Sequence, residues 1–388
     1  MKKYNICKKV ITFVVEIVRM IYKLIQFILR LYLPILFKRM EFRGLENVPQ
    51  DKPVIFAVNH QNAFLDGILV ALKLRRPVFF LTRSDVFKGK WIVKIFQLLN
   101  LVPIFRRQDG MGDITVKNRE TFKYCIQELE KRKPILIFPE GESEPIHHLF
   151  DLKKGVARLA FEAESKNNFK LGLHVVPVVI NYENHFVAGK KVFVNYLNPI
   201  LISGYKNLYF ENEVRSMSVF LKNLQHEMRE NMIHISGDYV KFKRRYWKGI
   251  IRQSRNDKEI IAAIKSIPQA MNEFSKEGYR WQREKYKYNK PRSFLMRVFY
   301  FLICLPGFLL FLPTIIVTKL ILAKVKDESF YLSITALSWL FFGLVQIIIA
   351  SIYIWNYTDW DIFVSSLLIL FAIVYFTLRN FYKPFKSG

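Results

Sequence analysis

Short apolar stretches alternate with helical patterns from Met40 to about Leu201, and this alternation restricts the fold more than any other feature. The expected strands cover residues 54–58, 78–81, 101–105, 135–138, 175–180 and 192–196. The expected helices cover residues 67–74, 91–99, 120–132, 155–165 and 213–233. Because such elements pack in layers, the pattern predicts an α/β fold with a largely parallel sheet flanked by helices.

Polar residues directly follow two of the expected strands. His60 comes after the first strand, with Asp66 a few residues further on, and Glu140 and Gly141 come after the fourth. The carboxyl ends of parallel strands meet at one edge of a sheet, where open α/β sheets bind their ligands. We therefore expect His60 and Glu140 to lie in one site.

Charge and apolar content are both high. The 388 residues are 51% hydrophobic and carry a formal net charge of +28. A positive charge of this size indicates an anionic partner, either nucleic acid or anionic lipid. Long uncharged apolar runs near both ends of the chain favour an anionic membrane and no nucleic acid.

Neither a metal site nor a disulfide is expected. The three cysteines, Cys7, Cys125 and Cys304, are scattered and form no Cys-x-x-Cys pair, so a reducing compartment is the default. His147 and His148 are adjacent on an expected loop, where neighbouring side chains seldom converge on one ion. We interpret both as loop residues.

Residues 1–39 contain a long apolar helical pattern with one polar stripe. The stripe consists of Glu16, Arg19, Lys23, Gln26 and Arg30, at spacings of three and four residues. A secretory signal would not carry it. We expect a helix that lies in the membrane surface with its cationic groups toward the headgroups, the alternative being a helix packed on the protein core.

Residues 236–297 are basic and rich in aromatic side chains. The basic residues Lys243, Arg244, Arg245, Lys248, Arg252 and Arg255 interleave with Phe242, Tyr246 and Trp247. We expect a helical region close to an anionic bilayer. A nucleic-acid-binding surface is one alternative, and an exposed helical face, which leaves the aromatic residues unexplained, is the other.

Residues 298–388 are expected to form a membrane domain. The runs 330–355 and 362–378 are free of charge and long enough to span, whereas Pro306, Gly307 and Pro313 interrupt the run 298–318. A re-entrant first run with two spans places every basic loop on the side of the α/β domain, whereas three full spans do not. We expect a multi-pass protein whose α/β domain lies on the cytoplasmic face.

Five blocks occur in a fixed order along the chain. They are Asn59-His60 with Asp66, Pro103-Ile104-Phe105-Arg106, Phe138-Pro139-Glu140-Gly141, Lys153-Lys154-Gly155 and Val176-Pro177-Val178. As a set they resemble the phospholipid and glycerol acyltransferase family, whose best-known members acylate lysophosphatidic acid. The resemblance covers about residues 40–202, and the Phe-Pro-Glu-Gly block is its most specific part.

The resemblance implies a mechanism and an acyltransferase catalytic domain over residues 40–235. His60 would be the base that takes the proton of an acceptor hydroxyl, and Asp66 would orient its imidazole, with no metal and no covalent intermediate. Arg106 would contact an acceptor phosphate, with a surface arginine as the alternative. Glu140 and Gly141 would form the acceptor-binding turn. Lys154 would add positive charge or be solvated.

Two departures from the family pattern affect the site. The family usually places four residues between the histidine and the aspartate, whereas here there are five, with Leu65 at the usual place of the acid. Either the turn bulges by one residue, which we favour, or Asn62 shares the orienting role. Asn62 is also a candidate substrate-binding residue. The family also continues Thr-Arg-Ser after its glycine, whereas this chain has Glu142, Ser143 and Glu144, which makes a phosphate-bearing acceptor less certain than the acyl transfer.

The expected function is transfer of a fatty acyl group from an acyl thioester to a lysophospholipid. The expected acceptor is 1-acyl-glycerol-3-phosphate, which would give phosphatidic acid for phospholipid biosynthesis. Glycerol-3-phosphate and an amino-acid lyso-lipid are the rival acceptors, and a non-catalytic lipid-binding membrane protein is the rival class. No cofactor is expected beyond the co-substrate, acyl-CoA or acyl-acyl carrier protein, and the sequence favours neither carrier.

Overall fold

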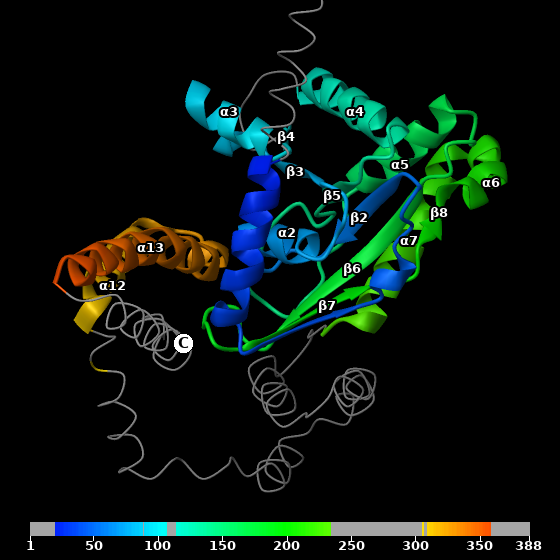
Figure 1. Ribbon diagram of the computed structural model, residues 1–388. Helices are drawn as coiled ribbons and strands as arrows, with labels where there is room; N and C mark the ends of the chain where they lie inside the picture. The colour runs from blue at the N-terminus through cyan, green and yellow to red at the C-terminus, as the bar shows by residue number, and fades with distance from the viewer. Residues whose placement is uncertain (1–19, 88, 107–113, 234–304, 306–308, 358–388) are drawn as a thin grey trace, which may run out of the picture.

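The computed structural model describes residues 20–87, 89–106, 114–233, 305 and 309–357, which include one sheet of eight strands (Figure 1). The strand order is β1-β7-β6-β2-β5-β3-β4, with β8 paired to β6. The strands are β1 (Arg39–Arg43), β2 (Val54–Val58), β3 (Phe79–Arg83), β4 (Leu101–Ile104), β5 (Ile135–Ile137), β6 (His174–Tyr182), β7 (Lys191–Tyr196) and β8 (Ile200–Leu201). The prediction of a largely parallel sheet is confirmed, because every pair of neighbouring strands in the order β6-β2-β5-β3-β4 is parallel.

The sheet has two features that the alternating pattern does not predict. The strand β7 runs antiparallel to β6, and β1, which carries charged residues, pairs parallel to β7 at the edge. A short connection of residues 183–190 joins β6 to β7, too short for the crossover helix that a parallel pair requires. The sheet is therefore mixed on this side.

Helices cover both faces of the sheet. They are α2 (Ala63–Ala71), α3 (Lys90–Leu98), α4 (Ile114–Glu130), α5 (Gly155–Lys166), α6 (Lys206–Glu211) and α7 (Glu213–Asn231). Successive side chains of a strand point to opposite faces, so β2 feeds two apolar layers. Ile55 and Ala57 pack in a layer with α4, α5 and α7, and Phe56 and Val58 pack in a layer with α2.

The N-terminal helix (residues 20–36) lies on the same face of the sheet as α2 (Figure 1). Gln26 Nε2 donates to the carbonyls of Ala71 and Leu74, and Arg30 Nε donates to the carbonyl of Leu72. The expected orientation of the polar stripe toward headgroups is therefore wrong for Gln26 and Arg30. Ala71 is the last residue of α2, so these two side chains supply donors to carbonyls at and just beyond the end of the helix.

The opposite face of the N-terminal helix is apolar and exposed. Met20, Leu24, Phe27 and Leu31 each expose more than half of their surface. The helix therefore packs on the protein through buried apolar side chains such as Leu33 and Leu36, as in the core-packed alternative, and it exposes a second apolar face.

Two helices form the described part of the C-terminal region. α13 (Tyr331–Tyr357) coincides with the predicted span at 330–355, and Glu328–Asn356 is the one helix among the described residues that is long and apolar enough to cross a membrane. α12 (Leu312–Lys324) begins with Pro313 in its first turn, and its 13 residues cover about 20 Å, less than a bilayer core of about 30 Å. Proline there starts a helix and does not break one.

Several predicted segments lie outside the described residues. They are residues 298–304 and 306–308 of the re-entrant run, the basic region at 236–297 and the second span at 362–378.

Candidate active site

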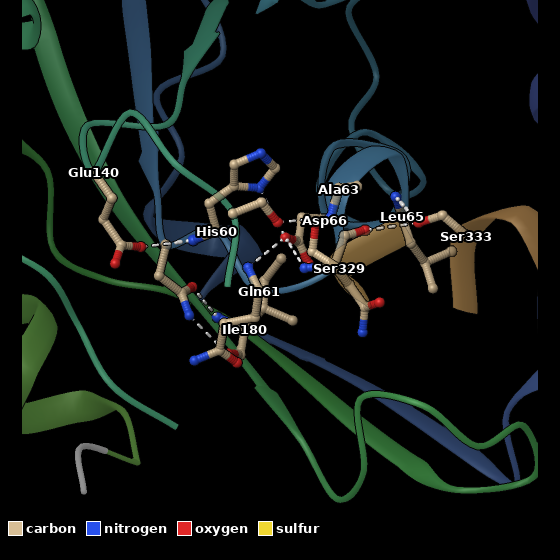
Figure 2. Close-up of polar contacts among 12 residues, drawn as sticks. His60, Gln61, Ala63, Leu65, Asp66, Glu140, Ile180, Ser329 and Ser333 are labelled. Carbon is tan, nitrogen blue, oxygen red and sulfur yellow. Dashed lines mark hydrogen bonds and ion pairs between the residues drawn. The ribbon is translucent and has the colours of Figure 1, made fainter. Parts of the chain in front are cut away.

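The site is built where β2 ends and the chain turns into α2. Asn59, the first residue after β2, exchanges two hydrogen bonds with the backbone of Ile180, at 2.7 and 3.0 Å, and so fixes the end of β2 against β6 (Figure 2). His60 Nδ1 lies 3.0 Å from Asp66 Oδ2. Asp66 is completely buried, whereas 16% of the His60 side chain is exposed. The two predicted partners therefore meet, and the histidine faces the surface.

Asp66 is held by several donors. Its Oδ2 accepts from the backbone amides of Gln61 and Asn62, each at 2.7 Å, and its Oδ1 accepts from the hydroxyl of Tyr182 at 2.7 Å. Burial and the nearby carboxylate raise the pKa of Tyr182 well above its ordinary value, so this hydroxyl stays protonated and donates. The network fixes both oxygens of the carboxylate.

The Asp66 carboxylate also determines the tautomer that we assign to His60. A carboxylate oxygen accepts hydrogen bonds, so Nδ1 of the neutral imidazole carries the proton and Nε2 has the lone pair. Nε2 has no hydrogen-bond partner in the described part of the chain. The ring also stacks on Phe138, with 3.7 Å between ring centroids and 12° between planes. The arrangement is that of a general base held in one orientation.

The five residues between His60 and Asp66 are accommodated by a left-handed backbone at Ala63, whose φ is 40°. Asp66 consequently lies in the first turn of α2, and Leu65 packs in the apolar layer beneath the helix. Asn62 contacts Asp66 through its backbone amide, and its buried side chain donates to the carbonyl of His185 at 3.2 Å. The Asn62 side chain, predicted to bind substrate, thus points into the protein.

Glu140 joins the end of β2 to the loop after β5. One carboxylate oxygen accepts from the backbone amide of His60 at 2.7 Å, and the other accepts from that of Phe150 at 2.8 Å. Burial raises the pKa of Glu140 to about 7, against the effect of the two amide donors. Glu140, predicted to bind the acceptor, therefore supports the backbone that carries His60.

Arg106 and Gly141 lie next to each other beside this loop. Arg106 Nη1 donates to the carbonyl of Gly141 at 3.4 Å, and Gly141 adopts the left-handed conformation with a φ of 77°. Lys154 is exposed at the start of α5, and the lysine that lies against Gly141 is its neighbour, Lys153. The guanidinium and the turn lie together, whereas Lys154 is not part of the contact.

The block Glu142-Ser143-Glu144 contributes to the same site. The hydroxyl of Ser143 accepts from the backbone amide of Ala63 at 3.1 Å, and the amide of Glu144 donates to the carbonyl of His60 at 3.1 Å. The side chains of Glu142 and Glu144 are exposed. The residues that replace the usual Thr-Arg-Ser thus brace the histidine turn and leave two carboxylates at the surface.

Tyr182 and Phe138 are site residues that the sequence analysis did not identify. Phe138 directly precedes the Pro-Glu-Gly turn, which was a usable signal. Tyr182 ends β6, and the parallel pairing of Val58 with Val178 brings that end beside His60. Its role depended on the strand order, which the sequence did not provide.

His147 and His148 lie in a loop, as predicted. His147 is buried, its Nε2 lies 2.7 Å from the carbonyl of Tyr182, and its ring packs against His185. The described residues contain no group of three or more His, Cys, Asp or Glu side chains arranged to hold a metal ion.

A pH-dependent stability is expected from Glu140. Because the pKa of this carboxyl is raised to about 7, the folded protein binds a proton that the unfolded chain releases at a lower pH. This stabilisation, about 3 kcal/mol, is present at about pH 4 and is lost as the pH rises toward 7. The Glu140→Gln variant has no titrating group at this position. The free energy of unfolding of the wild-type protein should therefore fall relative to that of the variant between about pH 4 and pH 7, and should not fall further above pH 7. Thermal unfolding of both proteins at several pH values measures the difference, and parallel curves would contradict it.

Residues 39–181 match the protein-family model described as Acyltransferase. The chain is 29% identical over 145 residues to the chloroplastic 1-acyl-sn-glycerol-3-phosphate acyltransferase of Arabidopsis thaliana, covering 37% of this chain and 36% of that protein. It is 32% identical over 152 residues to a 1-acyl-sn-glycerol-3-phosphate acyltransferase of Chlamydomonas reinhardtii, which covers 37% of this chain and 39% of that protein. It is 27% identical over 114 residues to glycerol-3-phosphate O-acyltransferase 2 of Saccharomyces cerevisiae, which covers 29% of this chain and 15% of that protein.

The chain thus spans less than two fifths of the length of these relatives. A solved structure, the 1-acyl-sn-glycerophosphate acyltransferase of Thermotoga maritima, superposes with a TM-score of 0.38 at 20% identity, covering 55% of this chain and 82% of that one. The family match includes the strands β1, β2 and β5, the His60–Asp66 pair and the Phe-Pro-Glu-Gly turn. Residues 39–181 are therefore similar to the acyltransferase family, by the family model and by the named relatives.

Proposed function

We propose that the protein transfers a fatty acyl group from an acyl thioester to the hydroxyl of a lysophospholipid. The observation that carries this proposal is the His60–Asp66 pair, at 3.0 Å, with Nε2 of the imidazole unpartnered among the described residues and facing the surface. The family of residues 39–181 supports the class of reaction. The 1-acylglycerol-3-phosphate acyltransferases among the relatives support the acceptor 1-acyl-glycerol-3-phosphate, with phosphatidic acid as the product.

In the proposed reaction, His60 Nε2 removes the proton of the acceptor hydroxyl while the oxygen attacks the thioester carbonyl carbon. Asp66 stabilises the imidazolium that forms. As the tetrahedral intermediate collapses, the ester bond remains, the carbon–sulfur bond breaks, and the thiolate of the carrier takes the proton from His60. Stacking on Phe138 restricts the tilt of the ring during both transfers.

The acceptor phosphate is proposed to bind at Arg106. A guanidinium pairs with phosphate through a fork of donors, and Arg106 lies at the turn of Gly141, on the same edge of the sheet as His60. The exposed carboxylates of Glu142 and Glu144 favour the second candidate, an amino-acid lyso-lipid without a free phosphate, since they would repel a dianion. Glycerol-3-phosphate is a further candidate, supported by the yeast relative.

The proposed location is a membrane, with the catalytic domain on the cytoplasmic face. α13 has the length and composition of a spanning helix, and the exposed face of the N-terminal helix is apolar. A small apolar pocket lies between these helices and α2, and its lining includes Phe64 and Leu65 of the histidine turn. An acyl chain that starts at His60 would enter apolar surroundings directly.

Incubation of the full-length protein with labelled acyl-CoA or acyl-acyl carrier protein and a panel of acceptors tests the proposal. The panel contains 1-acyl-glycerol-3-phosphate, glycerol-3-phosphate and an amino-acid lyso-lipid. We expect transfer to 1-acyl-glycerol-3-phosphate to be the fastest. Absence of transfer to every acceptor from either donor would favour a non-catalytic lipid-binding protein.

Arg106→Ala is expected to raise the KM for 1-acyl-glycerol-3-phosphate by about 10- to 100-fold, because a charge-assisted contact with phosphate is worth about 1.5–3 kcal/mol. The KM for the acyl thioester should change much less. Arg119→Ala, an exposed arginine on α4, is the matched control. An equal effect of both substitutions, or none from either, would remove Arg106 from the phosphate site.

A further inference from the structure

α13 lies outside the segment that matches the acyltransferase family, yet it contacts the histidine turn directly. Ser333, in its first turn, accepts a hydrogen bond from the amide of Leu65 at 3.2 Å, and its hydroxyl donates to the carbonyl of Asn62 at 2.8 Å (Figure 2). Ser333 is buried. One hydroxyl therefore bridges two backbone groups of the segment between His60 and Asp66.

This segment requires support because of its backbone conformation. Ala63 has a φ of 40°, where a residue with a Cβ is strained, and such strain persists only where surrounding contacts fix it. Within the turn, the amide of Leu65 also donates to the carbonyl of Asn62 at 2.9 Å. Ser143 holds the amide of Ala63 from one side, and Ser333 holds Asn62 and Leu65 from the other.

The position of Ser333 is itself fixed by packing. Leu332 and Ala336 are buried in the apolar layer beneath α2, and the hydroxyl of Tyr32 donates to the carbonyl of Ala336 at 2.8 Å. Phe330, just before α13, packs edge-on against Phe64 of the turn, with ring centroids 5.3 Å apart. The first turn of α13 therefore cannot shift along α2 without breaking these contacts.

We propose that Ser333 is a positioning residue for acyl transfer, which holds the turn of residues 61–65 so that Asp66 meets His60. The proposal rests on the function proposed above. It makes α13 part of the active site, although the helix is distant in the sequence. It also ties the position of the catalytic pair to a helix whose second half, from Phe341 to Trp355, is apolar and largely exposed.

Amide hydrogen exchange and steady-state kinetics of the full-length protein test this proposal together. In Ser333→Ala, we expect exchange in residues 61–66 to be about tenfold faster and kcat to be about tenfold lower, with the acceptor KM changed less than about twofold, because a misplaced pair affects the chemical step. Ser333→Thr keeps a hydroxyl and should restore most of both quantities. Ser351→Ala is the matched control, since the Ser351 hydroxyl donates within its own helix to the carbonyl of Ile347.

The proposal would be overturned by unchanged exchange in Ser333→Ala, by unchanged kcat in Ser333→Ala, or by a threonine variant as impaired as the alanine variant. An equal loss of kcat in Ser351→Ala would assign the effect to α13 as a whole and would also overturn it. If the wild-type protein transferred no acyl group, the proposed function would fail. The exchange measurement would still decide whether Ser333 holds the turn.

Discussion

Replacement of His60 by alanine is expected to reduce acyl transfer by about 10²- to 10⁴-fold, the usual contribution of a general base. Among the described residues, His60 is the histidine whose Nδ1 lies within hydrogen-bond distance of Asp66. No other described imidazole is therefore oriented to act as the base. The loss should appear in kcat for every acceptor substrate, because the base removes the hydroxyl proton of each acceptor.

His174→Ala is the matched control for this substitution. His174 begins β6, at the end of the sheet opposite to His60, and its Nδ1 lies 2.9 Å from the carbonyl of Gly172. Both variants should remain folded, as measured by thermal unfolding. Full activity of His60→Ala, with transfer confirmed in the wild-type protein, would remove the histidine from the mechanism.

Replacement of Asp66 by asparagine is expected to reduce transfer by about 10³- to 10⁴-fold. An amide in place of the carboxylate presents a donor toward His60 Nδ1 and favours the wrong tautomer, as a comparable substitution does in serine proteases. The loss should again be in kcat, with a small change in the acceptor KM.

Asp66→Asn should also destabilise the protein by about 1–3 kcal/mol, because Oδ2 accepts two backbone amides in addition to His60 and an amide nitrogen would leave such donors unpaired. Asp51→Asn, in the exposed loop before β2, is the control and should change neither quantity. A variant that is destabilised but retains kcat would show that Asp66 acts only on the fold.

The positions of several elements follow from local sequence patterns. β2 was predicted at its observed bounds, because a short run of β-branched and aromatic residues bounded by proline describes a buried strand. The pairing of His60 with Asp66 was expected from the resemblance to the acyltransferase family, and the left-handed Ala63 accommodates the additional residue.

The roles of other residues were not predictable because they depend on contacts between distant segments. Glu140 was expected to face the acceptor, yet it accepts the amides of His60 and Phe150. The stripe with Gln26 and Arg30 was expected to face the membrane headgroups, yet these two side chains supply donors to the end of α2. In both cases a polar pattern identified a hydrogen-bonding group, but not its partner.

The sequence alone determined the class of fold and the edge of the sheet that carries His60, because strand and turn patterns act over a few residues. Asp66 was identified as the partner of His60 by the resemblance to a family. Only the tertiary structure decided that Tyr182 and Ser333, 116 and 271 residues away from their partners in the turn, hold it in place. The physical reason is that a hydrogen bond between distant segments depends on strand order and helix packing. These arise from the burial of many side chains together and leave no local pattern.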